Sequence, residues 1–168
     1  MEYFADVTPE ETRMLRFAAF ITAGIFFSTA NAEIVATQSV EKEIVAKGEN
    51  GQFNVTRVSA SKVSPGEEVI YILDYENRDG APAEGVVLVM PVPRELVYIE
   101  GSVTGDGASA SFSADGGQTY LTRGRLMVNE DGQQRPARGS EITHIKWTLA
   151  EPMAPSAEGR VTFRGILK

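Results

Sequence analysis

The chain of 168 residues contains no cysteine, which excludes disulfides, zinc–thiolate sites and thiol nucleophiles. Its one histidine, His144, excludes a metal site built from several histidines, and a Ser-His-Asp triad would have to use that residue. Sixteen Lys and Arg against 23 Asp and Glu give a net charge of −7. An acidic chain without a basic cluster is a poor binder of nucleic acid or of an anionic membrane.

No apolar run is long enough to span a bilayer comfortably as a permanent helix. Residues 17–28 form an apolar run of twelve residues, preceded by Arg13 and Arg16 and followed by an Ala-Asn-Ala cleavage signature at residues 30–32. These features predict a secretory signal peptide over residues 1–32, with no permanent membrane span after processing. The alternative is that the run forms a buried helix of the fold.

The first residues do not suit a signal peptide. Residues 1–12 carry four acidic side chains and no basic one, whereas a signal peptide begins with a basic segment. Met14 would give a short basic leader directly before the apolar run, so we hypothesise that translation begins there. Removing residues 1–32 from the 168 leaves a mature chain of 136 residues. This interpretation places the protein in a periplasm, at the cell surface or in the extracellular space.

The clearest structural signal lies at residues 64–90. A Pro-Gly turn at residues 64–66 precedes an alternating run, residues 69–75, whose odd-numbered side chains are apolar and face one side. An Asn/Asp/Gly turn follows at residues 77–80, and a second apolar strand at residues 86–90 ends at a Pro-x-Pro stop. Turn, strand, turn and strand at this spacing are typical of an antiparallel β-sandwich.

The rest of the chain continues this pattern. Further short strands are predicted at residues 33–47, 53–58, 96–100, 110–113, 120–128, 142–149 and 160–168. Residues 129–140 are predicted to be a polar loop. With eight to ten strands and no amphipathic helix, we expect an all-β, immunoglobulin-like antiparallel sandwich over residues 52–168. Residues 33–51 are predicted to be a β-prone N-terminal arm with a Gly-rich hinge at residues 48–51.

The chain from residue 63 onward resembles the bacterial extracytoplasmic repeat family called the DUF11 domain. The residues that carry the resemblance are the Ser-Pro-Gly turn at 64–66, the strand at 69–77, the Asp-Gly-x-x-Ala segment at 79–85, the strand at 86–90, Pro-Val-Pro at 91–93 and the Tyr-x-x-Gly-Ser stretch at 97–102. The resemblance implies an immunoglobulin-like sandwich that serves as a module of a surface or secreted protein. Members of that family are often tandem, whereas this chain has one copy.

Two constellations are candidates for binding sites. Residues 113–120 fit the Asp-box pattern S-x-D-x-G-x-T-aromatic, in which the Asp side chain accepts backbone N–H groups in a hairpin turn. We interpret this motif as structural. Four side chains in Gly-rich loops offer oxygen atoms of the kind that Ca²⁺ prefers, although the spacing of a D-x-D-x-D loop is absent. They are Asp106, Asp115, Asn129 and Asp131, and the alternative is that they are ordinary turn residues.

His144 is the candidate for catalysis. It lies in the strand at 142–149 on the face opposite Ile145 and Trp147, so we expect His144 on the outer face and Trp147 in the core. No G-x-S-x-G sequence supplies a nucleophile. The sequence therefore predicts no catalytic residue, no cofactor and no metal ligand.

Two classes of function remain as hypotheses. A third class, an enzyme, is supported by scattered carboxylates alone. The first is a secreted structural or assembly protein, self-associating or binding other surface proteins, in which the arm at residues 33–47 pairs with a neighbouring subunit and builds a filament. The bland alternative is that the arm pairs within its own sheet. The second class is a monomeric adhesin or carbohydrate-binding module, for which Tyr98, Phe112 and Tyr120 are the candidate contact residues. The sequence identifies no ligand.

Overall fold

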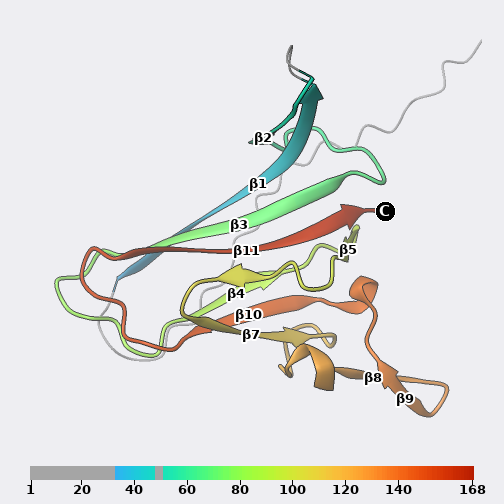
Figure 1. The fold of residues 1–168 in the computed structure, drawn as a ribbon. Helices are drawn as coiled ribbons and strands as arrows, with labels where there is room; N and C mark the ends of the chain where they lie inside the picture. The colour runs from blue at the N-terminus through green and yellow to red at the C-terminus, as the bar shows by residue number, and fades with distance from the viewer. Residues whose placement is uncertain (1–32, 48–50) are drawn as a thin grey trace, which may run out of the picture.

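The computed structural model describes residues 33–47 and 51–168, which form an antiparallel β-sandwich (Figure 1). The first sheet has the order β2-β1-β3-β11-β5, with β6 also paired to β11, and the second has the order β4-β10-β7. The predicted all-β sandwich is confirmed, while its immunoglobulin-like subtype stays a prediction. The predicted signal peptide, the start at Met14 and residues 48–50 of the predicted hinge lie outside the described residues.

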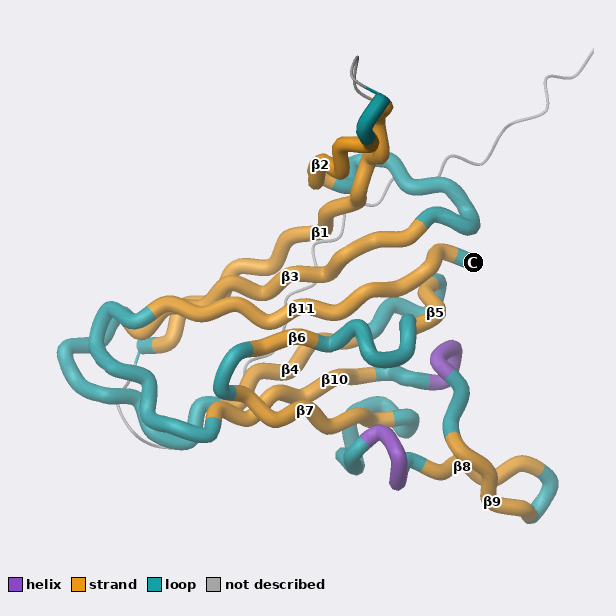
Figure 2. The backbone as a smooth tube through the Cα atoms, viewed as in Figure 1, coloured by secondary structure: helices purple, strands orange, loops and turns teal. Residues whose placement is uncertain are grey.

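Eleven strands and two short 3₁₀ helices make up the described chain (Figure 2). They are β1 (Ile34–Lys47), β2 (Phe53–Ser59), β3 (Glu68–Asn77), β4 (Val87–Pro91), β5 (Leu96–Tyr98), β6 (Thr104–Gly105), β7 (Ala108–Ser113), η1 (Arg123–Arg125), β8 (Met127–Glu130), β9 (Gln133–Pro136), η2 (Gly139–Glu141), β10 (His144–Leu149) and β11 (Glu158–Leu167).

The prediction of a polar loop over residues 129–140 is wrong. Strands β8 and β9 form a ribbon there, which turns at Asp131 and Gly132 with φ angles of 54° and 82°. An Asp-Gly pair favours such a tight turn because both residues tolerate a positive φ. The strands carry too few apolar side chains for alternation to reveal them, so the turn was the available signal. Likewise η1 occupies part of the region 120–128, where strands were predicted.

The Pro-Gly turn before β3 has the predicted form. The Glu67 N–H donates to the Ser64 carbonyl at 3.0 Å, and Gly66 has a φ of 88°, which explains the need for glycine. The odd-numbered residues 69–75 of β3 face the core, as predicted. Ile70 and Ile72, on the other face, are also buried, which alternation did not predict.

A charged cluster covers the outer face of the first sheet. Arg164 on β11 lies opposite Ile70 in register, and its guanidinium binds Glu43 at 2.8 Å and Glu68 at 2.6 Å. The aliphatic parts of such side chains shield apolar surface while the charged ends stay in water. Glu43 and Glu68 therefore help to hold the Arg164 side chain over Ile70.

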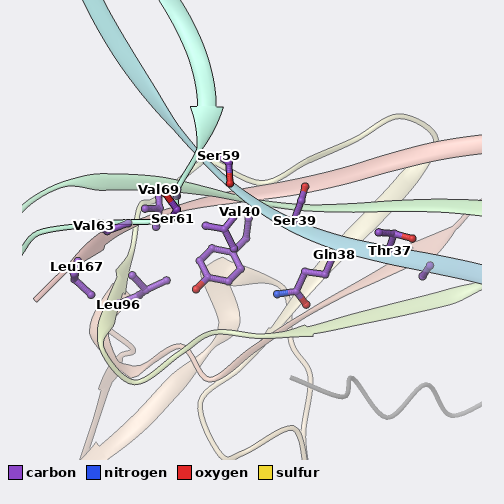
Figure 3. A pocket seen from close by; sticks show the side chains of 13 residues that line it. Thr37, Gln38, Ser39, Val40, Ser59, Ser61, Val63, Val69, Leu96 and Leu167 are labelled. Carbon is purple, nitrogen blue, oxygen red and sulfur yellow. The ribbon is translucent and has the colours of Figure 1, made fainter. Parts of the chain in front are cut away.

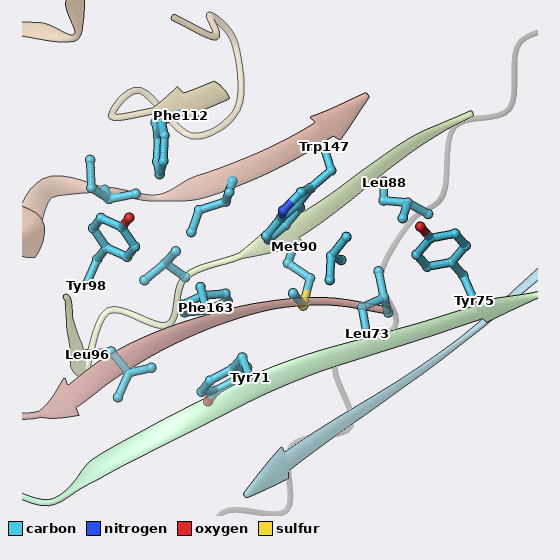
Figure 4. Close-up of a cluster of buried hydrophobic side chains, with 14 of the residues drawn as sticks. Tyr71, Leu73, Tyr75, Leu88, Met90, Leu96, Tyr98, Phe112, Trp147 and Phe163 are labelled. Carbon is cyan, nitrogen blue, oxygen red and sulfur yellow. The ribbon is translucent and has the colours of Figure 1, made fainter. Parts of the chain in front are cut away.

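The core lies between the two sheets (Figure 4). Tyr71 and Phe163 stack with ring centroids 5.0 Å apart, and Trp147 is buried as predicted. The Trp147 indole N–H donates to the Thr104 carbonyl at 3.1 Å, which satisfies its polar group. Gly105 lies against this ring, because a Cβ there would approach Val161 Cγ1 to 2.8 Å and Trp147 Cδ1 to 3.1 Å.

Asn77 ties together the loops at the far end of β3. Its side chain is fully buried, and its amide nitrogen donates to the carbonyls of Ala81, Met153 and Ala154 at 2.9, 2.9 and 3.3 Å. Its side-chain oxygen accepts the Asp79 N–H at 3.0 Å. A buried amide satisfied on both ends fixes the loops, because each lost bond would leave a buried group unpaired.

The segment at residues 33–47 is not a separate arm. Residues Ile34–Glu41 of β1 pair antiparallel with Ile70–Asn77 of β3, so the arm pairs within its own sheet. The predicted domain boundary at residue 52 is corrected for this reason: β1 lies between β2 and β3, and the first sheet includes it. The assembly hypothesis predicted that residues 33–47 are a spare strand donated to a neighbouring subunit. Because Ile34–Glu41 already pair with β3, this segment is not free to be that donor strand.

Candidate functional site

The second half of β1 leaves the sandwich together with β2. Glu41–Lys47 pair with Phe53–Ser59, and this β1–β2 ribbon projects beyond the body of the sandwich (Figure 1). Val45 and Val55 are paired in register and share a face with Phe53, and their side chains are 61%, 60% and 71% exposed. The ribbon therefore presents an apolar surface to solvent.

The ion pairs recorded among the described residues of this ribbon lie at its base. Arg57 binds Glu43 at 3.2 Å, and Lys42 binds Glu67 at 3.0 Å. The apolar residues lie further along the ribbon. An isolated two-stranded ribbon is marginally stable in water, and exposed apolar patches of this kind mark interaction surfaces.

The β8–β9 ribbon also projects from the sandwich, but it is anchored differently. Arg135 binds Glu130 and Glu141, each at 2.6 Å, and Glu141 also accepts the Arg138 N–H at 2.7 Å. Val128 packs against the core. This ribbon is held to the body by its own charges and apolar contact, so it has less need of a partner than the β1–β2 ribbon.

The charged side chains of the β8–β9 ribbon predict a lowered pKa for the carboxyl group of Glu141. Hydrogen bonds from Arg135 and from the Arg138 backbone lower the pKa of Glu141 from 4.5 to about 2. A lowered folded-state pKa means that the stabilisation is present above the unfolded value and is lost as pH falls from 4.5 towards 2. NMR titration of the Glu141 carboxyl carbon should show this pKa, and Arg135→Ala should raise it. A wild-type midpoint near 4.5 would contradict the network.

An open groove lies on the inner side of the first sheet, at the base of the β1–β2 ribbon. It has a volume of about 500 Å³, and residues of β1, β3, β5, β11 and the 59–63 segment line it (Figure 3). Val40, Val63 and Leu96 contribute apolar surface. Among the described residues, none of strands β4, β7 or β10 lines this groove, so it lies outside the closed core.

Gln38 projects from β1 at this groove, as Figure 3 shows. Its side-chain oxygen is shielded from solvent and has no hydrogen-bond partner within the described chain. A shielded amide oxygen without a donor is costly, and a donor entering the groove would satisfy it. The outer edge of β1 beside it, Ile34–Ser39, has no partner strand among the described residues.

The Asp-box segment is a structural turn, as predicted. Asp115 accepts the N–H groups of Gln118 and Thr119, each at 3.0 Å, and the Ser113 hydroxyl at 2.7 Å. These bonds from Ser113 and Thr119 hold the pKa of Asp115 well below its usual range. Gly116 and Gly117 have φ angles of 79° and 85°. The carboxylate is thus engaged by its own turn.

Two of the other candidate calcium ligands, Asn129 and Asp131, also have local roles. Asn129 accepts the Gly132 N–H at 2.9 Å, and Asp131 forms the β8–β9 turn. Across residues 33–47 and 51–168, no group of three His, Cys, Asp or Glu side chains is placed to hold a metal ion. Asp106, Asp115, Asn129 and Asp131 therefore do not form a ligand set in this structure.

His144 lies on the face of β10 opposite Ile145 and Trp147, and the Asp-box turn half-buries it. Its Nδ1 is 3.2 Å from the Thr143 hydroxyl, while Asp115 bonds Ser113 and Thr119 instead. Burial lowers the pKa of His144, against an opposing effect of Asp115. Hydrogen bonds run from the imidazole through the Thr143 and Ser113 hydroxyls to Asp115. No bond among those recorded for the described residues joins the imidazole directly to the carboxylate, as a triad requires.

The predicted aromatic contact residues do not form a surface platform. Tyr98 and Phe112 are buried with ring centroids 5.5 Å apart, and Tyr120 is half-buried with Lys146 Nζ 4.3 Å from its ring centroid. The most exposed aromatic side chain described is Phe53, which sequence reasoning had not singled out. The sequence signal that could have indicated its exposure was its alternation with Val55, in a predicted strand to which no partner strand had been assigned.

Comparison with known proteins leaves the function open. No protein-family model, curated protein or solved structure matches this chain. Among the described residues, no helix has the length and apolar character needed to cross a membrane. The geometry of the β1–β2 ribbon and of the groove at its base is therefore the basis for a functional conclusion.

Proposed function

We propose that this protein is a non-enzymatic, exported structural protein that self-associates at the cell surface or in the extracellular space. One observation carries the proposal: the β1–β2 ribbon projects from the sandwich with Val45, Phe53 and Val55 largely exposed. The proposed function is still assembly, as expected from the sequence, but a different segment of the chain makes the contact. The donor is the ribbon, because the first half of β1 is already paired with β3.

The expected energies determine how the ribbon binds. Burying the exposed parts of three such side chains contributes roughly 3–6 kcal/mol. Association costs about 4–15 kcal/mol in lost translational and rotational freedom. Apolar burial alone thus falls below most of the range of that cost, so stable assembly also requires backbone pairing along a strand edge. Strand β2 offers such an edge, with Arg57 as its one charged side chain and no proline.

The test replaces the exposed apolar side chains of β2. Phe53→Ser combined with Val55→Ser should convert assemblies of the wild type into monomers, because the variant loses the apolar contact while the core is untouched. The full chain is produced in an exporting bacterial host, and light scattering with size-exclusion chromatography and negative-stain electron microscopy measure its assembly. The matched control is Val87→Ser combined with Ile166→Ser, two side chains that are each 39% exposed elsewhere.

The control should assemble like the wild type. A wild type that stays monomeric at all accessible concentrations would overturn the proposal, and binding to a glycan array would then favour a monomeric adhesin or carbohydrate-binding module. The intact mass of the same sample tests export separately: a product that begins at Glu33 supports cleavage of the predicted signal peptide. A product that keeps all 168 residues would overturn the exported state alone.

A further inference from the structure

We propose that the groove beneath β1 is the acceptor for a second copy of this chain, whose β2 strand adds to the free edge Ile34–Ser39. This inference rests on the proposed self-association and names the surface that receives the ribbon. Each copy then presents a donor, its β1–β2 ribbon, and an acceptor, its groove. Copies joined in this way associate head to tail.

The free edge of β1 is the first reason. Strand β1 has 14 residues: seven, Glu41–Lys47, pair with β2, and the Val40 carbonyl accepts the Ala60 N–H. The remaining six, Ile34–Ser39, have no neighbour on that side within the described chain, and they are one residue shorter than the seven-residue β2. Sheet edges are usually protected by charges, proline or bulges, yet these six residues contain no charge and no proline.

The chemistry of the groove is the second reason. Val40, Val63 and Leu96 offer apolar surface at one end, and the shielded Gln38 side-chain oxygen needs a hydrogen-bond donor. An extended strand supplies both, since its side chains alternate between the faces and its backbone carries N–H groups. Antiparallel addition that fills the free edge places residues 54–59 of the incoming strand opposite residues 39–34, and it stops before Val40, whose carbonyl already accepts the Ala60 N–H.

The third reason is that no like charges oppose each other at this contact. The edge and the groove lining carry no charged side chain, so the incoming strand meets no like charge there. Arg57, the one charge on β2, is already paired with Glu43 of its own ribbon. The β5 and β7 edges suit an incoming strand less well, because β5 has three residues and Leu121 bridges to Phe112 on β7.

The size of the contact sets its strength. A seven-residue strand is about 23 Å long and occupies one strand spacing of about 4.8 Å, so one added strand makes a narrow contact. Stable complexes bury about 1,200–2,000 Å². A single donor–acceptor contact is therefore expected to be reversible and to dissociate on dilution, so a covalent trap detects it better than chromatography.

Disulfide trapping tests the inference in a chain that has no native cysteine. In the antiparallel register, Asn54 of the donor lies opposite Ser39 of the acceptor, at the separation that a disulfide spans. Within one chain Asn54 pairs with Ala46, seven residues along β1 from Ser39, which is about 23 Å away. A disulfide between positions 54 and 39 must therefore join two chains.

Full-length Asn54→Cys and Ser39→Cys proteins are oxidised separately and as an equal mixture, at a concentration where the wild type assembles. We expect cross-linked dimers in the mixture at least tenfold above either protein alone, and a ladder of multimers from the double variant. Thr37→Cys replaces Ser39→Cys to detect a register shifted by two residues, and either cross-link supports the acceptor site. Ser109→Cys, on the exposed edge of β7, is the matched control and should not cross-link to position 54.

The outcomes separate this inference from the proposed function. Cross-linking of Asn54→Cys with itself alone means that ribbons pair with each other, which overturns the acceptor site and leaves self-association standing. Equal trapping at Ser109→Cys, or no trapping in either mixture while the wild type still assembles, also overturns the acceptor site alone. A wild type that is monomeric by light scattering at every accessible concentration, together with no cross-linking in either mixture, overturns both.

Discussion

Trp147→Ala is expected to lower the free energy of unfolding by about 3–5 kcal/mol. The side chain is fully buried in the core cluster between the two sheets, which also holds Met90 and Phe163 (Figure 4). The surrounding strands are held by their backbone ladders and cannot collapse into the space, so the cost includes a cavity. This loss is a large part of the total stability of a typical domain.

A second substitution separates packing from hydrogen bonding at the same position. Trp147→Phe keeps much of the apolar contact but leaves the Thr104 carbonyl without the indole N–H, so we expect a loss of about 1–2 kcal/mol. Urea unfolding followed by far-ultraviolet circular dichroism measures both, because Trp147 is the one tryptophan and fluorescence would be lost. Leu121→Ala, at an exposed position, is the control. Equal losses for the two Trp147 variants would contradict the cavity argument.

Asn77→Ala is expected to cost about 2–4 kcal/mol, although it removes few atoms. The Asn77 side chain is fully buried, and in the variant four backbone groups lose it as a hydrogen-bond partner. These groups are the Asp79 N–H and the carbonyls of Ala81, Met153 and Ala154. Urea unfolding measures the loss, and Asn54→Ala on the exposed face of β2 is the matched control. A loss below about 0.5 kcal/mol would show that the loops do not depend on Asn77.

The variant Asn77→Asp tests the same contacts through the pH dependence of stability. The carboxylate keeps the acceptor for Asp79 but faces three carbonyl oxygens in a buried site, so burial and repulsion raise its folded-state pKa above the unfolded value. A raised folded-state pKa means that stability is lost as pH rises through it. The stability of Asn77→Asp relative to Asn77→Ala should therefore increase as pH falls. A difference that does not change with pH would contradict the proposed contacts.

The assembly proposal changes what the N-terminal segment contributes. Residues 33–47 looked spare because a sandwich is expected to have about seven strands, and enough strands followed residue 52. The structure uses the first part of this segment to extend the first sheet and the second part to support β2. Deleting the whole segment would remove an interior strand, so point substitutions on Phe53 and Val55 give the cleaner test.

Much of the fold could be predicted because its signals are local. The Pro-Gly turn at residues 64–66 and the alternation of residues 69–75 depend on neighbouring φ angles and on the two-residue period of a strand. The inward parity of Trp147 and the structural role of the Asp-box turn follow from the same short-range rules. Strand β9 was missed because Gln133, Gln134 and Arg135 form a ladder through backbone groups, without an apolar pattern.

The candidate site could not be predicted, because it depends on pairings between distant residues. Whether β1 meets β3 or a neighbouring chain is decided by the pairing of residues that lie 29 to 43 positions apart in the sequence, which alternation does not encode. The Asn77 side-chain amide donates a hydrogen bond to the Met153 carbonyl, which lies 76 residues away in the sequence. By itself the sequence determined the fold class, the main turns and the inward faces of the strands. Only the tertiary structure decided which edge stays open, which apolar side chains stay exposed and where the groove lies, since each is what remains after long-range packing is complete.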